Sequence, residues 1–373
     1  MKKIFLSSPH MSGYEMKYVQ QAFETNWIAP LGPNLDGFET EISDYIGIGS
    51  AVALSSGTSA IHMALKSLEI GQGDIVFCSS LTFSASANPI IYQNATPVFI
   101  DSEPDSWNMS PKALEKAFER YSPKAVIVVH LYGQSADMDS LLDICNKHNV
   151  PIIEDSAESL GATYKERMSG TLGKFGIFSF NGNKIITTSG GGMLVSQDEE
   201  ALKKVRFWAT QAKDPARHYQ HSEIGYNYRM SNVVAGIGRG QLKILNNRIE
   251  KKKEIFQTYK DAFKSIEDIV MMPICDYGKP NYWLSCFTLK KESSISPLDI
   301  MLELEAENIE SRPIWKPMHL QPIFEKYDFF NHNNDGISVA EDIFNRGICL
   351  PSDTKMTQED IERVIQIIKR FFN

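Results

Sequence analysis

Short apolar runs alternate with amphipathic stretches along the first half of the chain. The runs predict buried strands, whereas the stretches between them repeat apolar residues every three or four positions, as helices do. This alternation predicts an α/β fold with a mainly parallel sheet, whose ligands bind at the carboxyl ends of the strands. Strands are expected at 51–54, 74–78, 97–100, 125–130, 151–154, 175–180 and 192–196, and crossover helices at 57–68, 83–92, 111–118 and 138–148.

Helical patterns also occupy the two ends of the chain. A capping-box sequence at 12–15 precedes apolar residues at helical spacing. A long helical stretch begins after about Ser231, and the segment 358–372 repeats apolar residues as a packed terminal helix does. We therefore expect a large domain at 1–250 and a smaller α+β C-terminal domain at 251–373.

Composition limits the classes of function that are open to the chain. Its 373 residues carry a net charge of −8, with 42% hydrophobic and 23% charged residues, which is typical of a folded soluble protein. No long basic run occurs, so binding to nucleic acid is not expected. The five cysteines form no CxxC pair and no zinc-binding spacing, so no metal site is predicted. The N-terminal apolar stub is too short for a signal peptide and no apolar run is long enough to span a membrane, which favours a cytoplasmic protein.

The segment 55–59, Ser-Ser-Gly-Thr-Ser, follows a predicted strand and opens a predicted helix. Backbone N–H groups at such a helix start and the Thr58 hydroxyl converge on one point, and a helix N-terminus favours an anion by roughly 0.3 to 1 kcal/mol. An ordinary helix N-cap explains the same residues. The segment is neither a Walker loop nor a dinucleotide-binding fingerprint. A phosphate site and a simple cap both remain open.

A carboxylate and a lysine follow this segment in the chain. Asp155 ends a buried-looking strand, where it can hydrogen-bond a protonated ring nitrogen, the partner that a pyridoxal cofactor requires. Lys184 stands among small and polar residues ahead of Gly190–Gly192, and a lysine beside close-packed backbone can lose its proton and attack an aldehyde. A helix cap and a solvated surface lysine are the ordinary explanations. The order of the signals along the chain favours one shared site.

Several motifs together resemble the pyridoxal-phosphate sugar aminotransferases of the DegT/DnrJ/EryC1/StrS family. These motifs are Gly57–Ala60, Asp155–Glu158, Ser179–Lys184, Gly190–Gly192 and Gly225–Ser231. Further segments are similar to the branch that aminates UDP-4-keto-6-deoxy-N-acetylglucosamine, the bacillosamine-type aminotransferases. These segments are 8–11, 27–32, 207–211, 315–319 and 347–351. The resemblance runs nearly end to end and implies the aspartate-aminotransferase-like fold, fold type I.

The resemblance also implies roles for individual residues around pyridoxal 5'-phosphate. Lys184 would bind the cofactor aldehyde covalently and would then move a proton as general base and acid. Asn227 would reach the phosphate from the neighbouring subunit, so that a homodimer with shared active sites is implied. Asp155 would pair with the pyridinium nitrogen, Gly57, Thr58 and Ser179 would hold the phosphate, and Phe83 would stack on one ring face.

Glu158 departs from the commonest family pattern, in which Gln or His stands near the phenolic oxygen of the cofactor. A carboxylate repels a phenolate unless it is protonated or turned away, although the bacillosamine-like branch also accepts Glu there. The implied substrates are L-glutamate and a nucleotide-linked 4-keto-6-deoxy sugar, with a UDP sugar preferred and GDP- or dTDP-linked sugars as alternatives. Arg229, His319 and Trp315 are the candidate substrate residues, and Arg229 is equally a candidate for structural support.

Three other functions fit the pattern less well. Relatives that act as sugar dehydratases carry histidine in place of the lysine, and a non-catalytic regulator would have lost the set of residues that is complete here. A nicotinamide-dependent sugar oxidoreductase needs a glycine fingerprint after its first strand, but the glycine-rich segment 236–240 lies in a helical stretch. His218 and His221 lack a third metal ligand, and an exposed loop is expected there.

Overall fold

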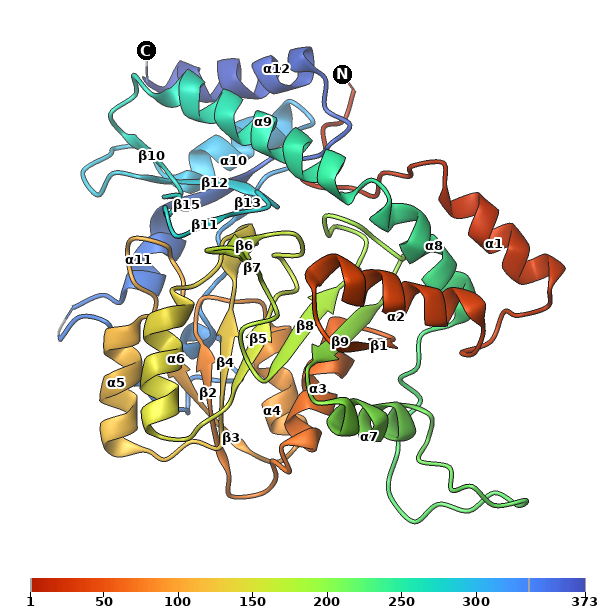
Figure 1. The fold of residues 1–373 in the computed structure, drawn as a ribbon. Coiled ribbons are helices and arrows are strands. Elements are labelled where there is room, and N and C mark those ends of the chain that lie inside the picture. The colour runs from red at the N-terminus through yellow and green to blue at the C-terminus, as the bar shows by residue number, and fades with distance from the viewer. Residues whose placement is uncertain (1, 335, 373) are drawn as a thin grey trace.

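The computed structural model describes residues 2–334 and 336–372 of the chain. Its largest sheet has eight strands in the order β1-β9-β8-β5-β4-β2-β3-β14 (Figure 1). Neighbouring pairs from β8 to β14 are parallel, and β8-β9 and β9-β1 are antiparallel. The strands are β1 (Ser50–Leu54), β2 (Ile75–Ser79), β3 (Thr96–Ile100), β4 (Ala125–Val129), β5 (Ile152–Asp155), β8 (Phe175–Ser179), β9 (Gly192–Ser196) and β14 (Phe329–Phe330). The predicted mainly parallel sheet and its seven predicted strands are confirmed.

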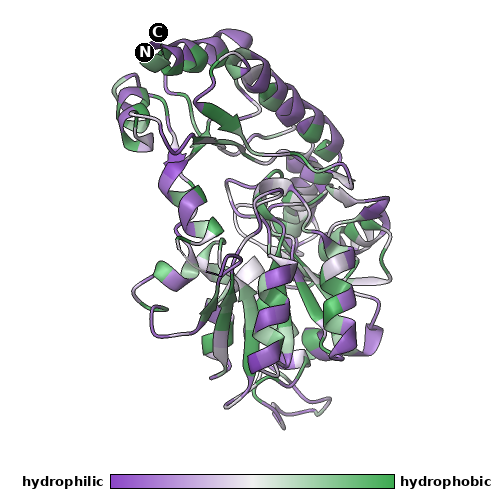
Figure 2. Cartoon of the chain, turned by 90° about the vertical axis from the view of Figure 1, so that its left-hand side faces the viewer, coloured by the Kyte–Doolittle hydropathy of each residue, from purple (hydrophilic) through white to green (hydrophobic). Residues whose placement is uncertain are grey.

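Helices cover both faces of this sheet because successive strand residues point to opposite sides. On β2, Phe77 packs in the core that contains α5 and α6, whereas Val76 and Cys78 pack in the core that contains α3 and α4. The helices around the sheet are α2 (Pro33–Ile46), α3 (Gly57–Ser67), α4 (Asn88–Tyr92), α5 (Pro111–Arg120), α6 (Met138–Lys147) and α7 (Glu199–Ala209). Figure 2 shows apolar strands at the centre and helices whose outer surfaces are hydrophilic.

A second, antiparallel sheet of four strands lies in the C-terminal part of the chain, in the order β10-β12-β15-β13. Three helices pack on one of its faces through a core that includes Phe263, Phe287 and Ile365. The elements of this part are α9 (Leu245–Phe263), β10 (Ile269–Met271), β12 (Ser285–Leu289), α10 (Pro297–Ala306), β13 (Arg312–Pro313), α11 (Val339–Arg346), β15 (Gly347–Leu350) and α12 (Gln358–Lys369). A small third sheet joins β6 (Thr163–Tyr164), β7 (Arg167–Met168) and β11 (Gly278–Lys279). The predicted terminal helix is confirmed as α12, followed by the 3₁₀ helix η4 (Arg370–Phe372).

The chain crosses between its two large sheets more than once. Ile4 bridges Ile309, so the N-terminal segment lies with the small sheet, and Figure 1 shows both termini at that end of the molecule. In the other direction, β14 returns from the C-terminal part and pairs with β3. The predicted domain boundary at residue 250 falls inside α9, and the division into 1–250 and 251–373 stays a prediction.

Two local predictions were only partly right. The helix α1 (Glu15–Glu24) begins after Tyr14, and the carboxylate of Glu15 accepts from the backbone N–H of Ser12 at 2.8 Å, but the Ser12 hydroxyl also donates to that carboxylate instead of capping the helix. The long helical stretch after Ser231 is two helices, α8 (Asn232–Leu242) and α9, with a break at residues 243–244.

Proline interrupts the helix predicted at 83–92. The structure has a 3₁₀ turn, η1 (Ser84–Ser86), followed by the short helix α4, in which Pro89 occupies the first turn and supplies no N–H. Between η1 and the terminal η4, the described chain has two further 3₁₀ turns, η2 (Leu131–Gly133) and η3 (Met318–Leu320).

The glycine-rich segment 236–240 lies inside α8 and packs helices together. A Cβ atom at Gly238 would lie 2.5 Å from the ring of Phe38 on α2, and one at Gly240 would lie 2.6 Å from the backbone of Glu15. These glycines therefore permit close helix contact and are not a nucleotide-binding turn. Within the described residues, no helix combines the length and the hydropathy that crossing a membrane requires.

Candidate active site

One cavity of about 320 Å³ opens at the carboxyl ends of the parallel strands. Its wall comes from the loops after β2, β5 and β8, from the last residue of β4 and from the N-terminus of α3, and two tryptophans from the C-terminal part close it. Every residue that was predicted to bind the cofactor lines this cavity except Asn227. The lining residues discussed below are Gly57, Thr58, Phe83, Ser86, Asp155, Glu158, Ser179, Asn183, Lys184, Trp283 and Trp315.

The N-terminus of α3 presents free hydrogen-bond donors to the cavity. Ser56 and Ser59 form a reciprocal capping box, so the first turn is well ordered. The amides of Gly57 and Thr58 and the hydroxyls of Thr58 and Ser179 have no hydrogen-bond partner among the described residues. Unpartnered donors at a helix N-terminus form a site for an anion such as phosphate.

Glycine lets the neighbouring backbone approach this turn. A Cβ atom at Gly192 would lie 2.3 Å from the carbonyl of Ser56 and 2.4 Å from the amide nitrogen of Gly57. Any side chain at this position would therefore displace the turn that carries the free amides. The close approach of the backbone thus explains why glycine stands at position 192.

Asp155 ends β5 and is held in one orientation. Its Oδ2 accepts a hydrogen bond of 2.6 Å from the Ser86 hydroxyl, which lies 2.7 Å from the Thr82 hydroxyl, and its Oδ1 accepts from the amide of Ala157 at 3.2 Å. The residue is only 5% exposed, yet it lines the cavity. A buried carboxylate aimed into a cavity suits a cationic partner such as a protonated ring nitrogen.

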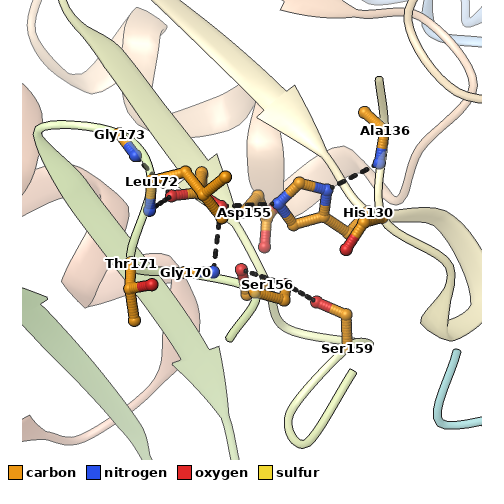
Figure 3. Close-up of polar contacts among 12 residues, drawn as sticks. His130, Ala136, Asp155, Ser156, Ser159, Gly170, Thr171, Leu172 and Gly173 are labelled. Carbon is orange, nitrogen blue, oxygen red and sulfur yellow. Dashed lines mark hydrogen bonds and ion pairs between the residues drawn. The ribbon is translucent and has the colours of Figure 1, made fainter. Parts of the chain in front are cut away.

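Glu154, the neighbour of Asp155, points to the other face of the sheet, because successive strand residues alternate in direction. Figure 3 shows its partners His130, Gly170, Leu172 and Gly173 close together. Its carboxylate accepts hydrogen bonds from the amides of residues 170, 172 and 173 and lies 2.9 Å from Nε2 of His130. His130 Nδ1 accepts from the amide of Ala136 at 3.0 Å, so Nε2 is the ring nitrogen that donates to the Glu154 carboxylate. This buried network holds the turn that leads into β8.

The amine of Lys184 lies inside the cavity, near a carboxylate and over an aromatic ring. Its Nζ is 3.7 Å from Oε1 of Glu158 and 4.1 Å from the centre of the Trp283 ring. Burial lowers the pKa of the Lys184 amine, although the carboxylates of Glu158 and Asp155 oppose that shift. A lowered pKa raises the share of neutral amine, which is the form that reacts with an aldehyde.

Glu158 is fixed by hydrogen bonds from two other elements. Its carboxylate accepts from the backbone amide of Tyr132 at 2.8 Å and from Nε1 of Trp315 at 3.3 Å. Burial raises the pKa of the Glu158 carboxyl, and the charge of Lys184 acts in the opposite direction. The side chain is therefore held beside the lysine amine.

Phe83 and Trp315 form an aromatic wall at the mouth of the cavity. Their ring centres lie 5.5 Å apart, and both residues also line a second cavity of about 630 Å³. The two cavities share Thr82, Phe83, Asn183 and Trp315. A larger molecule can therefore extend from the first cavity into the second.

Three of the residues singled out from the sequence lie elsewhere. Asn227 is exposed and does not line the cavity of its own chain. Arg229 is buried, pairs with Glu39 and donates to the carbonyl of Ala53 at 3.0 Å. His319 bonds the hydroxyl of Ser80 at 2.7 Å, and burial lowers its pKa to about 4. Neither Arg229 nor His319 lines either cavity.

The sequence matches the model of the DegT/DnrJ/EryC1/StrS aminotransferase family over residues 9–369. EpsN of Bacillus subtilis (strain 168), which is assigned as a pyridoxal phosphate-dependent aminotransferase, is 55% identical over 100% of this chain and 96% of EpsN. GDP-perosamine synthase of Caulobacter vibrioides is 37% identical over 98% of this chain and 97% of that protein. The UDP-4-amino-4,6-dideoxy-N-acetyl-beta-L-altrosamine transaminase of Campylobacter jejuni is 31% identical over 89% of this chain and 88% of that protein.

Solved structures agree with the family match. The PLP-form of Spr1654 from Streptococcus pneumoniae superposes with a TM-score of 0.90 at 26% identity, over 99% of this chain and 98% of that chain. The architecture is that of the fold type I pyridoxal-phosphate enzymes. The chain belongs to the DegT/DnrJ/EryC1/StrS aminotransferase family, and it is a pyridoxal-phosphate-dependent aminotransferase.

The cavity fits pyridoxal phosphate group by group. The unpartnered amides of Gly57 and Thr58 and the free hydroxyl of Ser179 match the phosphate. The buried carboxylate of Asp155 matches the pyridine nitrogen, and the amine of Lys184 matches the aldehyde. The roles of these residues stay predictions that follow from this fit.

Some residues that shape the site were not found from the sequence. Ser86 bonds Asp155 directly, but a serine ahead of an expected helix gives no signal of that contact. For Trp283 the sequence leaves two roles open, lining of the substrate cleft and core packing, and nothing in the sequence places it over Lys184. Both contacts join segments that are far apart in the chain.

Proposed function

We propose that the enzyme moves the amino group of L-glutamate to the C4 ketone of a nucleotide-linked 4-keto-6-deoxy sugar. The substrate would be UDP-2-acetamido-2,6-dideoxy-hexos-4-ulose, and the product the 4-amino-4,6-dideoxy sugar. The proposal is carried by the meeting of Lys184 and Asp155 in one cavity beside a set of unpartnered phosphate donors. The motif resemblance at 8–11, 27–32 and 315–319 supports a UDP sugar.

Lys184 is the residue that we propose to bind the cofactor and to move the proton. Pyridoxal phosphate supplies an aldehyde that accepts amino groups and a ring that withdraws electrons. Once the amino donor displaces it, the Lys184 amine is free inside a buried site, where its lowered pKa favours the neutral form that a base requires. Asp155, oriented by Ser86, would keep the ring nitrogen of the cofactor protonated, because its negative carboxylate balances the positive charge of that nitrogen.

The second cavity supports a substrate as large as a nucleotide sugar. It adjoins the Lys184 cavity, has a volume of about 630 Å³, and lies within the range of roughly 300 to 1,000 Å³ that is usual for ligand sites. Lys316 is among its lining residues, and its positive charge suits a diphosphate, whereas Arg312 in the same lining is paired with Glu310 at 2.6 Å. Trp315, which lines both cavities, is the candidate substrate residue that the geometry favours.

A GDP-linked 4-keto sugar is the second candidate substrate. The specific observation in its favour is the 37% identity to GDP-perosamine synthase, which exceeds the 31% identity to the UDP-sugar transaminase. The cofactor-binding residues do not discriminate between these nucleotides, because they contact the cofactor and not the sugar nucleotide.

A panel of substrates tests the proposal. Purified protein with pyridoxal phosphate and L-glutamate is incubated with UDP-, GDP- and dTDP-linked 4-keto-6-deoxy sugars, and the products are identified by mass spectrometry and NMR. The expected result is amination at C4 of the UDP sugar. Preferred turnover of the GDP sugar would select the second candidate, and no amination of any of them would overturn both.

We also propose a homodimer in which Asn227 of each chain completes the site of the other. Asn227 is exposed and lies outside its own chain's cavity, which leaves it available to a second copy. Lys184→Ala and Asn227→Asp enzymes should each be inactive, whereas subunits reassociated from a mixture should recover roughly a quarter of the native activity, because half of the random dimers contain one intact site. A mixture that stays inactive would contradict the shared site.

A further inference from the structure

A second buried lysine, Lys252, lies on α9 and has no part in the chemistry described above. Its side chain is 2% exposed, and its ammonium donates to the carbonyls of Trp283 and Ser352, each at 2.8 Å, and to the hydroxyl of Ser7 at 3.4 Å. An ammonium has three N–H donors, so each has an acceptor. No carboxylate lies within ion-pair distance of it in the described part of the chain.

Burying this charge does not favour folding. Desolvation lowers the pKa of Lys252 to about 7, Arg248 acts in the same direction, and Asp353 opposes the shift. An apolar residue of similar volume at such a position is often neutral or stabilising. The buried charge of Lys252 is therefore not explained by stability, and its hydrogen bonds indicate another role.

Two of the three acceptors lead to the residue that precedes Lys184. The Ser7 hydroxyl, which accepts from Lys252, donates to the carbonyl of Asn183 at 2.9 Å. Nε1 of Trp283, whose carbonyl also accepts from Lys252, donates to the same Asn183 carbonyl at 2.8 Å. The four residues Lys252, Ser7, Asn183 and Trp283 form a closed ring of hydrogen bonds, which we call the Lys252 ring.

The Lys252 ring fixes the position of the Trp283 side chain as well. The backbone amide of Trp283 donates to Asn281 at 2.9 Å, and its indole stacks on Tyr132 with ring centres 6.2 Å apart. The centre of the indole lies 4.1 Å from the amine of Lys184. The ring thus sets both the backbone from which Lys184 projects and the aromatic surface against which its amine rests.

The segments that supply the acceptors are also held by hydrogen bonds that do not involve Lys252. The amide of Ser8 donates to Asp353 at 2.9 Å, which ties the N-terminal segment to the loop after β15. The hydroxyl of Tyr259, two helical turns after Lys252 on α9, donates to the carbonyl of Pro351 at 2.9 Å. Lys252 therefore joins parts that are already held, so its loss is expected to loosen the ring locally.

We propose that Lys252 is a positioning residue, which holds Lys184 in its reactive orientation through Ser7, Asn183 and Trp283. The proposal rests on the function above in taking Lys184 as the reactive amine. Small displacements of a reacting group lower the rate strongly, so the alignment of one lysine is a sufficient reason to retain a buried charge.

Hydrogen–deuterium exchange of the cofactor-free protein tests the ring without any activity assay. In Lys252→Met the amides of 183–188 should exchange roughly tenfold faster or more, because a charge-assisted hydrogen bond of the ring is lost, while the amides of α12 keep their protection. Ser7→Ala, which removes one link and leaves the buried lysine in place, should give a smaller change at the same amides. If Lys252→Met does not fold, Ser7→Ala carries the test.

A matched control comes from Ser285, two residues after Trp283. Its buried hydroxyl has no hydrogen-bond partner in the described parts of the chain, so Ser285→Ala removes an equal group from the same region without touching the ring. It should leave the exchange of 183–188 unchanged. An equal acceleration in Ser285→Ala and Ser7→Ala would overturn the proposal, since it would show a general loosening.

The visible absorbance of the cofactor-loaded protein gives a second readout. The pH midpoint of its colour change reports the proton on the nitrogen of Lys184, and it should shift in Lys252→Met and in Ser7→Ala but not in Ser285→Ala. The variant that combines Lys252→Met with Ser7→Ala should have the same pH midpoint as Lys252→Met alone, because both substitutions break the same ring of hydrogen bonds. Unchanged exchange and an unchanged midpoint in an otherwise active Lys252→Met would overturn the positioning role. Failure of the proposed function would appear differently, as a native protein that aminates no sugar.

Discussion

The surroundings of Lys184 and Lys252 differ, although both lysines contact the same tryptophan. Lys184 faces the Trp283 ring from the cavity, beside hydroxyls and amides that have no partner among the described residues. Lys252 reaches the carbonyl of Trp283 from the small-sheet side and has all three donors matched. The contrast teaches that burial alone does not make a lysine reactive. What distinguishes the reactive region is a set of polar groups left free for a ligand.

The largest effect is expected where the reactive amine itself is removed. Lys184→Ala should abolish both transfer from L-glutamate and transfer to the keto sugar, with a loss of at least about 10⁴-fold, because one residue supplies both the covalent attachment and the proton transfer. The two half-reactions are measured separately. Lys252→Met serves as the comparison and should keep measurable turnover. Substantial turnover by Lys184→Ala would break the distinction between the two lysines.

The next largest effect is expected at Asp155. Asp155→Asn keeps the side-chain volume but removes the charge that holds the ring nitrogen protonated, so kcat at saturating cofactor should fall by roughly 10²- to 10³-fold. Ser86→Ala should cost less, since it removes one of the hydrogen bonds to that carboxylate. An unchanged kcat in Asp155→Asn would show that the carboxylate does not act on the ring.

The phosphate cradle, which consists of the Gly57 and Thr58 amides and the Thr58 and Ser179 hydroxyls, should affect the binding of pyridoxal phosphate more than the rate of the reaction. Thr58→Val and Ser179→Ala each remove a hydroxyl that faces the cavity, and each should weaken the affinity for pyridoxal phosphate by roughly tenfold or more, as expected for a hydrogen bond to a charged group. Equilibrium dialysis measures the dissociation constant. Ser135→Ala removes a buried hydroxyl that lacks a partner in the described structure, and it should leave that constant unchanged. Equal losses in all three variants would contradict the cradle.

The smallest effect concerns stability and pH at Lys252. Its pKa is about 7 in the folded protein, whereas an unfolded lysine titrates near 10.4. Between these values the unfolded chain binds more protons, so the stability of the native protein rises with pH. The buried charge lowers the free energy of unfolding by its full amount below the folded pKa. Above that pKa the free energy of unfolding recovers by at most about 1.4 kcal/mol per pH unit. Urea unfolding at pH 7 and pH 9 should show a larger rise in the native protein than in Lys252→Met, in which only other groups such as Lys184 contribute, and identical pH dependence in the two would contradict it.

Much of the fold and part of the site could be predicted from the sequence. Alternating apolar runs placed the seven strands, and local motifs at Gly57, Asp155 and Lys184 identified residues that do meet in one cavity. These predictions succeeded because each depends on neighbours in the chain. A strand end or a helix start determines which groups reach the edge of the sheet.

The rest depends on contacts between distant segments. Ser86 meets Asp155, and Lys252 meets Trp283, only because the fold brings separate elements together. Arg229 stands in a family motif, but its guanidinium forms a buried ion pair with Glu39. Local pattern carries no information on such pairings, so the Lys252 ring could not be found from the residues alone, and the sequence left structural support and anion contact both open for Arg229.

The most direct test of the central claim distinguishes the two lysines chemically. Borohydride treatment of the yellow protein loaded with pyridoxal phosphate fixes the cofactor on the amine that holds it, and peptide mapping then locates the label. One labelled peptide is expected, which contains Lys184, and none that contains Lys252. A label on Lys252 or on any other residue, or a colourless protein that takes up no label, would contradict it.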